Sequence, residues 1–208
     1  MAQDDDAQTH LLTLRDFLRY AISRFQAGGI AYGHGTTNAL DEAAFIILEA
    51  LHLPIDKLDP FLDARLLPAE RARLASLIDQ RVTTRKPAAY LLGKAYIKGI
   101  PFHVDERVIV PRSFIGELLT DSMFDENGRG ELIDAETIET VLDLCTGSAS
   151  LAIVAAHVLP HAHVDAVELS PDAIEVARRN IADSEVGERI ELLQGDLFAP
   201  VAGRRYDL

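Results

Sequence analysis

The sequence predicts an α/β fold in which a helical bundle is followed by a β-hairpin linker and a parallel sheet. Amphipathic helical stripes fill the first ninety residues. Short β-branched runs come next. Strands and helices then alternate, which is typical of a parallel sheet with right-handed crossovers. The predicted domains are residues 1–94 for the helical domain, 95–112 for the linker and 113–208 for the sheet domain.

The N-terminal half holds three predicted amphipathic helices. The first covers residues 11–25, where leucine and isoleucine recur at helical spacing. Asn38 is a suitable N-cap for the second, because acidic residues follow in the first turn and favour the helix dipole. The third begins near Pro68 and runs to about Arg85. Three such helices in ninety residues favour a small bundle.

The middle of the chain predicts three short features. Residues 100–113 are interpreted as a β-hairpin with its turn at Asp105-Glu106. Ser113 is placed to cap a short helix. Residues 125–137 are predicted to form an acidic, exposed loop.

The C-terminal part alternates strands with helices. Ser170 and Pro171 are the expected cap and first residue of the second helix in this part. Tyr206-Asp207-Leu208 resembles the start of a fourth strand, so we expect a C-terminally incomplete sheet whose open edge favours self-association. The three predicted strands cover residues 140–145, 163–168 and 190–194, and the helices between them cover 150–159 and 171–182.

The ends of these strands predict a pocket for an adenosine. Ligands of such sheets lie beyond the carboxyl ends of the strands. Gly147 permits a close approach after the first strand. Glu168 ends the second strand 21 residues later, where an acid is placed to bind ribose hydroxyls. Asp196 can accept from an adenine amino group, and Leu197 with Phe198 can cover the ring. The alternative is a ligand-free α/β domain, in which Gly147 serves only the turn.

The residues near the pocket favour S-adenosylmethionine over a dinucleotide. NAD prefers G-x-G-x-x-G, whereas Cys145, Gly147 and Ala149 occupy the spaced positions here. No G-K-[ST] follows, which excludes a Walker A loop. Acidic side chains oppose a pyrophosphate but not the sulfonium and ammonium groups of S-adenosylmethionine. An NAD enzyme remains a further alternative.

Several stretches together resemble the HemK/PrmC/PrmB family of protein-glutamine methyltransferases. The second half is similar to the class I methyltransferase core of that family in DLCTGSASLAI, VDAVELSPDAIEVARRNI and GDLF followed by YDL. AYGHGTTNALDEA and RKPAAYLLGKAYIKGIPFHVDERVIVPRS resemble the PrmB-type branch, which methylates a glutamine of a large-subunit ribosomal protein. The resemblance runs from about residue 11 to residue 208.

The resemblance implies a site for S-adenosylmethionine. It places the methionine end of the cofactor at the loop after the first strand, the ribose at Glu168, and the adenine at Asp196 and Leu197. Arg112 is a candidate for substrate binding, or alternatively forms a surface ion pair. The candidate loop residues are Asp143, Cys145, Thr146, Gly147, Ser148 and Ala149.

The chain also departs from the family pattern. The family loop commonly reads T-G-S-G, but Ala149 stands at its last position, where a methyl group narrows the pocket or forbids a positive φ. The family sheet continues to an Asn-Pro-Pro-Tyr whose oxygens orient the substrate amide, and these 208 residues contain none. We therefore expect no catalytic residue in this chain. We interpret it as an N-terminal part of such an enzyme, which is inactive alone. The alternative is a non-catalytic module that binds a ribosomal protein.

The charge of the chain limits the classes of partner that it is expected to bind. The net charge is −13, and residues 101–208 carry all of it, with 8 Lys and Arg against 21 Asp and Glu. This disfavours direct nucleic-acid binding and suits a basic protein partner, although solubility alone would also explain it.

Cys145 is the single cysteine, which excludes an internal disulfide. His157, His161 and His163 are expected to hold no metal. No signal or membrane-spanning segment is recognised, and a cytoplasmic protein is expected.

Overall fold

The computed structural model describes residues 7–122 and 135–208. It divides into two compact units, residues 1–92 and residues 93–208. Most of the predicted acidic loop at 125–137 lies outside the described residues, and its last part forms the 3-10 turn η3, Ala135–Thr137.

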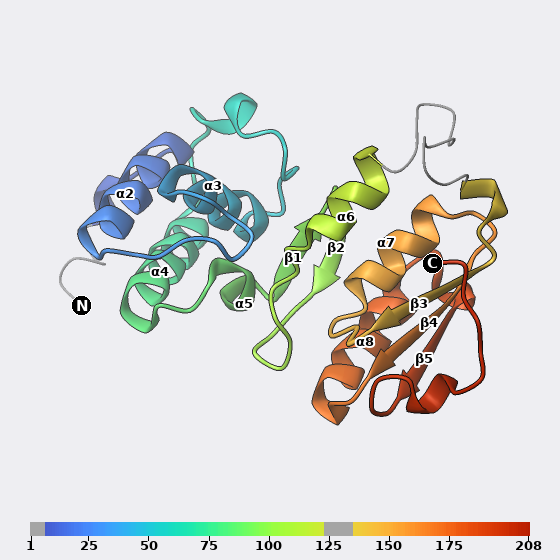
Figure 1. The fold of residues 1–208 in the computed structure, drawn as a ribbon. Coiled ribbons are helices and arrows are strands. Elements are labelled where there is room, and N and C mark those ends of the chain that lie inside the picture. Colours follow the sequence, from blue (N-terminus) through green and yellow to red (C-terminus); the bar gives the residue numbers. More distant parts are fainter. Residues whose placement is uncertain (1–6, 123–134) are drawn as a thin grey trace. The chain divides into compact units, whose positions relative to one another are not determined.

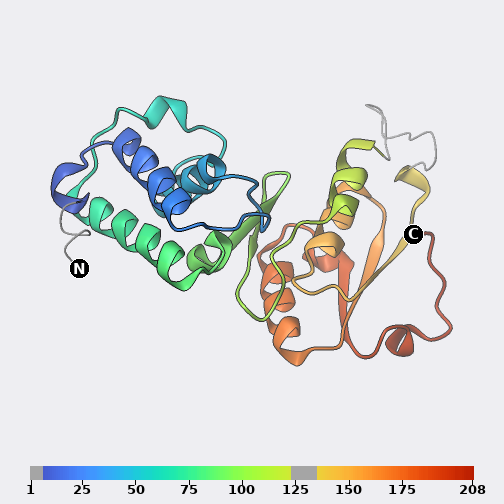
Figure 2. The same cartoon turned by 60° about the vertical axis from the view of Figure 1, so that its left-hand side comes forward.

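The first unit is built from helices that pack on one another (Figures 1 and 2). All three predicted helices are confirmed, and Asn38 caps the second by accepting a hydrogen bond from the backbone N–H of Asp41 at 3.0 Å. Pro68 is the first residue of the third helix. The elements are α2 (Leu14–Ala27), α3 (Ala39–Ala50), η1 (Asp59–Phe61), α4 (Pro68–Thr84) and α5 (Ala88–Leu92).

A buried ion pair joins several segments of this unit. Glu42 of α3 and Arg81 of α4 are each 2% exposed, and Arg81 Nε donates to Glu42 Oε1 at 2.7 Å. The other guanidinium nitrogens donate to the backbone carbonyls of Ala31 and Arg85 at 2.9 and 3.0 Å. Glu42 Oε1 also accepts from the backbone N–H of Ala88 at 3.3 Å. A charge buried without a partner is unfavourable, so both side chains need the bonds of this network. The same bonds connect α3 and α4 to the segments before and after them.

The second unit contains a parallel sheet of three strands in the order β3-β4-β5. Both crossovers step in the same direction, so right-handed connections place α7 and α8 on one face. These helices contact each other and the strands (Figure 1). The predicted alternation is confirmed by β3 (Thr140–Leu144), α7 (Ser150–Val158), β4 (His163–Glu168), α8 (Pro171–Asp183), η4 (Gly187–Arg189), β5 (Ile190–Gln194) and η5 (Ala199–Val201).

The predicted fourth strand is not formed as a strand, but its residues bond to β3. The backbone N–H of Asp207 donates to the carbonyl of Thr140 at 3.0 Å, and that of Leu142 donates to the carbonyl of Leu208 at 3.0 Å. β4 lies on one side of β3, whereas the segment at Asp207 and Leu208, which follows β5, bonds to β3 on the other side, so the connections of the sheet reverse direction at β3. That is the topological switch point at which open α/β sheets bind ligands.

The hairpin differs from the prediction. Its strands are β1 (Lys94–Ile97) and β2 (Ile100–His103), so the predicted hairpin at residues 100–113 is wrong beyond His103. Lys98 and Gly99 both have positive φ, 47° and 81°, as a two-residue hairpin loop of the I′ type requires. Asp105 instead forms a local turn in which it accepts from the backbone N–H of Val108 through its carbonyl.

A short helical segment follows the hairpin. It comprises α6 (Phe114–Glu117) and η2 (Leu118–Ser122). Ser113 caps α6 as predicted, because its hydroxyl accepts from the backbone N–H of Ile115 at 3.2 Å. Among the helices of residues 7–122 and 135–208, none is both long and apolar enough to cross a membrane.

Candidate functional site

The loop after β3 opens on a cavity of about 350 Å³ in the second unit. Residues 143–148 line one part of it, and residues 109 and 111–113, which follow the hairpin, line another. Arg112, the candidate for substrate binding, thus meets Asp143, Cys145, Thr146, Gly147 and Ser148 at one cavity. The cavity lies at the carboxyl end of β3, beside the switch point.

The backbone of this loop is left-handed at alternate residues. Cys145, Gly147 and Ala149 all adopt left-handed φ values of 58°, 57° and 61°. The left-handed turn at Cys145 ends β3 one residue earlier than predicted. Non-glycine residues in this region cost roughly 1–2 kcal/mol each, and such strain clusters at functional sites.

Ala149 shows how the loop tolerates a methyl group. The expectation that alanine forbids a positive φ here is wrong, because Ala149 adopts it with its side chain fully buried. Its N–H donates to the carbonyl of Thr146 at 2.9 Å, and its own carbonyl accepts from Ile153 at 3.0 Å. These bonds at the start of α7 hold the residue in the left-handed region.

Asp143 anchors the loop to α7. Its Oδ2 accepts from the hydroxyl of Thr146 at 2.5 Å and from the backbone N–H of Ala152 at 3.1 Å. Burial raises the pKa of Asp143 above its ordinary value, and these two hydrogen bonds oppose that rise. The nearby charge of Glu168 acts in the same direction as burial on this pKa.

Glu168, the last residue of β4, joins the loop to the next turn. Its Oε2 accepts from the backbone N–H of Gly147 at 2.9 Å. Its Oε1 accepts from the N–H groups of Leu169 and Ser170, both at 2.9 Å. The spacing of 21 residues noted in the sequence therefore corresponds to direct contact between the two predicted positions.

The end of β5 lies beside the end of β4. The N–H of Gly195 donates to the carbonyl of Glu168 at 3.0 Å, and Asp196 and Leu197 follow at the surface. Leu197 and Phe198 are 49% and 62% exposed. Asp196 and Leu197 do not line the cavity at β3. The three strand ends are nevertheless neighbours along one edge of the sheet.

Asn180 of α8 is a buried polar residue that the sequence reasoning missed. It is 5% exposed, and its amide nitrogen donates to the carbonyls of His103 and Ser148 at 3.0 and 2.9 Å. Its Oδ1 accepts from the backbone N–H of His103 at 2.7 Å. A signal was available, because Asn180 continues the apolar stripe of Ala173, Val176 and Ala177.

The three histidines near α7 form no site with one another. His161 pairs with Glu136, with its Nε2 3.0 Å from a carboxylate oxygen. Within the described ranges, no group of three or more histidine, cysteine or acidic side chains is arranged to hold a metal ion.

The second unit has the class I methyltransferase fold. Its sheet is parallel and carries the candidate site at the carboxyl ends of its strands. Residues 130–208 match the family described as methyltransferase small domain. Among solved structures, S-adenosylmethionine-dependent methyltransferase SibL in its apo form aligns with a TM-score of 0.33 at 18% identity, over 86% of this chain and 63% of that chain.

Two sequence relatives are more similar to this chain. It is 56% identical over 200 residues to the ribosomal protein uL3 glutamine methyltransferase of Bradyrhizobium diazoefficiens, covering 95% of this chain and 62% of that protein. It is 54% identical over 198 residues to the protein of the same name from Bordetella pertussis, covering 95% and 65%. The chain thus spans a little under two thirds of these relatives. Over that part the chain is similar to them along nearly its whole length, in agreement with the resemblance that its motifs indicated.

Proposed function

We propose that the chain binds S-adenosylmethionine at the loop of residues 145–149 and forms the cofactor-binding part of a protein-glutamine methyltransferase. The proposed reaction of the longer protein is methyl transfer to the side-chain amide nitrogen of a glutamine in ribosomal protein uL3. The names and the identity of the relatives support this substrate. The choice of cofactor depends on one observation, the occupation of the loop N–H groups by carboxylates.

Binding of a dinucleotide uses free N–H groups at the start of a helix to hold its pyrophosphate. Here the N–H of Ala152 is bonded to Asp143, and that of Gly147 is bonded to Glu168. The N–H of Ala149 is bonded to the carbonyl of Thr146. A phosphate would therefore find few donors and two negative charges. The same charges favour the sulfonium and ammonium groups of S-adenosylmethionine.

The proposed roles follow the strand ends. The loop from Asp143 to Ala149 would contact the methionine end, with Arg112 facing the same cavity. Glu168 makes three backbone bonds, and a carboxylate has about four lone-pair sites, so it retains capacity for a ribose hydroxyl. Asp196 and Leu197 would contact the adenine. When bound, the cofactor supplies the electrophilic methyl group.

The substrate side of the proposal is assigned to the part of the relatives that this chain does not cover. A carboxamide nitrogen is a poor nucleophile and needs acceptors that orient it, and no Asn-Pro-Pro-Tyr occurs in the chain. We therefore propose that this chain binds the cofactor but does not transfer the methyl group. The acidic second half suits a basic ribosomal protein, and the cytoplasm is the proposed location.

Titration of the chain with S-adenosylmethionine in a calorimeter tests the proposal. Saturable micromolar binding is expected, with none for NAD. Glu168→Ala should abolish the binding, because it removes the ribose acceptor and releases the N–H of Gly147. Glu175→Ala is the control, since Glu175 is an exposed acid on α8. Absence of binding by the unmodified chain would contradict the proposal. If uL3 still bound, the non-catalytic module would be favoured.

A second assay addresses the reaction. The chain is incubated with uL3 and S-adenosylmethionine labelled on its methyl group. We expect no label on uL3 from the 208 residues alone. Steady transfer would refute the claim that the chain only binds the cofactor.

A further inference from the structure

We propose that Asn180 is a positioning residue that couples the β-hairpin to the backbone of the cofactor loop. This inference rests on the proposed function, because the loop is taken to be where S-adenosylmethionine binds. Asn180 lies on α8, between two segments that are distant in the sequence. It contacts His103 at the end of β2 and Ser148 in the loop.

The contacts require an amide side chain. Asn180 Nδ2 uses its two hydrogens on the carbonyls of His103 and Ser148, while Oδ1 accepts from the N–H of His103. This pattern determines the orientation of the amide, because only the nitrogen can face two carbonyls. The side chain is 5% exposed, so water cannot readily replace a lost partner.

The bond to Ser148 acts on the strained part of the loop. Ser148 lies between Gly147 and Ala149, which both have left-handed φ values. Because a peptide group is planar, holding the carbonyl of Ser148 also orients the N–H of Ala149. That N–H donates to the carbonyl of Thr146 and closes the turn. Asn180 therefore orients the peptide plane at the middle of the candidate site.

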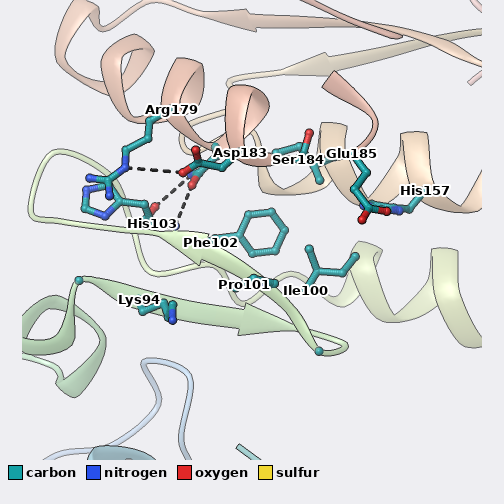
Figure 3. A pocket seen from close by; sticks show the side chains of 14 residues that line it. Lys94, Ile100, Pro101, Phe102, His103, His157, Arg179, Asp183, Ser184 and Glu185 are labelled. Atoms are coloured by element: carbon teal, nitrogen blue, oxygen red, sulfur yellow. Dashed lines mark hydrogen bonds and ion pairs between the residues drawn. The ribbon is translucent and has the colours of Figure 1, made fainter. Parts of the chain in front are cut away.

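The two bonds to His103 attach the hairpin at the same point. Figure 3 shows β2 and the last turns of α8 on opposite sides of a cavity, with His103 beside Arg179. The cavity has a volume of about 480 Å³, so packing between these elements is interrupted there. The amide bridge thus provides a direct connection from the hairpin to the loop. A displacement of the hairpin would be transmitted to Ser148.

The test compares Asn180→Ala with Val176→Ala, a fully buried position on the same helix that lacks these bonds. Both variants should melt at lower temperature. Asn180→Ala should also weaken S-adenosylmethionine binding about tenfold, which corresponds to one buried hydrogen bond. Val176→Ala should change it less than about twofold. Equal affinity of the Asn180 variant and the unmodified chain, or equal weakening by both variants, would overturn the proposal.

Hydrogen exchange supplies a readout that does not need the cofactor. In Asn180→Ala, amides of residues 146–149 and 102–104 should exchange about tenfold faster than in Val176→Ala. If the unmodified chain binds no S-adenosylmethionine, the proposed function fails, and this measurement still decides the role of Asn180. Unchanged exchange in the loop would refute it. If Asn180→Ala does not fold, Asn180→Ser, which keeps one donor, is measured in both assays with the same criteria for the direction of change.

Discussion

Replacing Glu42 by glutamine is expected to destabilise the helical unit by about 3–5 kcal/mol, because it leaves a buried guanidinium without its counter-charge. Glu42 and Arg81 are each 2% exposed. The two carboxylate oxygens accept from Arg81 Nε and Nη2 at 2.7 and 3.3 Å. Glutamine has nearly the same shape, so the change tests charge and hydrogen bonding rather than volume.

The magnitude follows from the groups left behind. A glutamine side chain keeps one acceptor, whereas its NH₂ group would face a donor nitrogen of Arg81 in either amide orientation, and in one of them the N–H of Ala88 as well. Arg81 keeps its bonds to the carbonyls of Ala31 and Arg85, which do not neutralise its charge. Since folded domains are stable by about 5–15 kcal/mol, such a loss would be a large fraction of the total.

Urea unfolding at pH 7, followed by far-UV circular dichroism, measures the loss, and hydrogen exchange of α3 and α4 assigns it to the first unit. The matched variant replaces both Glu42 and Arg81 by methionine. It should be more stable than Glu42→Gln, because it removes the unpaired charge as well as the pair. A loss below about 1 kcal/mol for Glu42→Gln, or a less stable double variant, would refute the reasoning.

Three further predictions concern the second unit. Burial raises the pKa of Asp143 in the folded protein. The stability that its protonated carboxyl group contributes is therefore fully present below the ordinary pKa of 3.8, and it is lost as the pH rises through the pKa of the folded state. The stability of Asp143→Asn relative to the unmodified chain should therefore increase from pH 3.5 to pH 6 in urea titrations, and a decrease would contradict the assignment. Cys145→Gly should stabilise by up to about 1 kcal/mol by relieving a left-handed φ at an exposed residue, measured in the same way; destabilisation would show that the turn is not strained. Ser170→Ala should destabilise by about 1 kcal/mol in thermal unfolding, because its hydroxyl caps α8, and an unchanged midpoint would argue against the cap.

Much of the second unit could be predicted from the sequence because its signals are local. Ser170 and Pro171 marked the start of α8 through cap chemistry alone. The distance from Gly147 to Glu168 matched one crossover between adjacent parallel strands, and the two residues are bonded. Both inferences needed only short-range patterns and the rules of parallel sheets.

The errors arose where the backbone departs from the preference of its residue types or where partners are distant in the sequence. Lys98 adopts a positive φ beside Gly99, so the hairpin turn lies earlier than Asp105-Glu106 suggested. Ala149 adopts a conformation that alanine disfavours, because two backbone bonds hold it. The bond from Asn180 to Ser148 spans 32 residues, and no local pattern specifies such a partner. Burial of a polar residue on an apolar stripe was the available signal.

The single thiol of the chain lies exposed in the cavity beside Gly147. A small fluorinated tag could therefore be attached there without adding or removing any other sulfhydryl. The fluorine resonance of the tag would report cofactor binding and motion of the loop in real time. The alkylation rate of Cys145 would give the same information without spectroscopy. Cys145 is thus a labelling position at the loop where S-adenosylmethionine is proposed to bind.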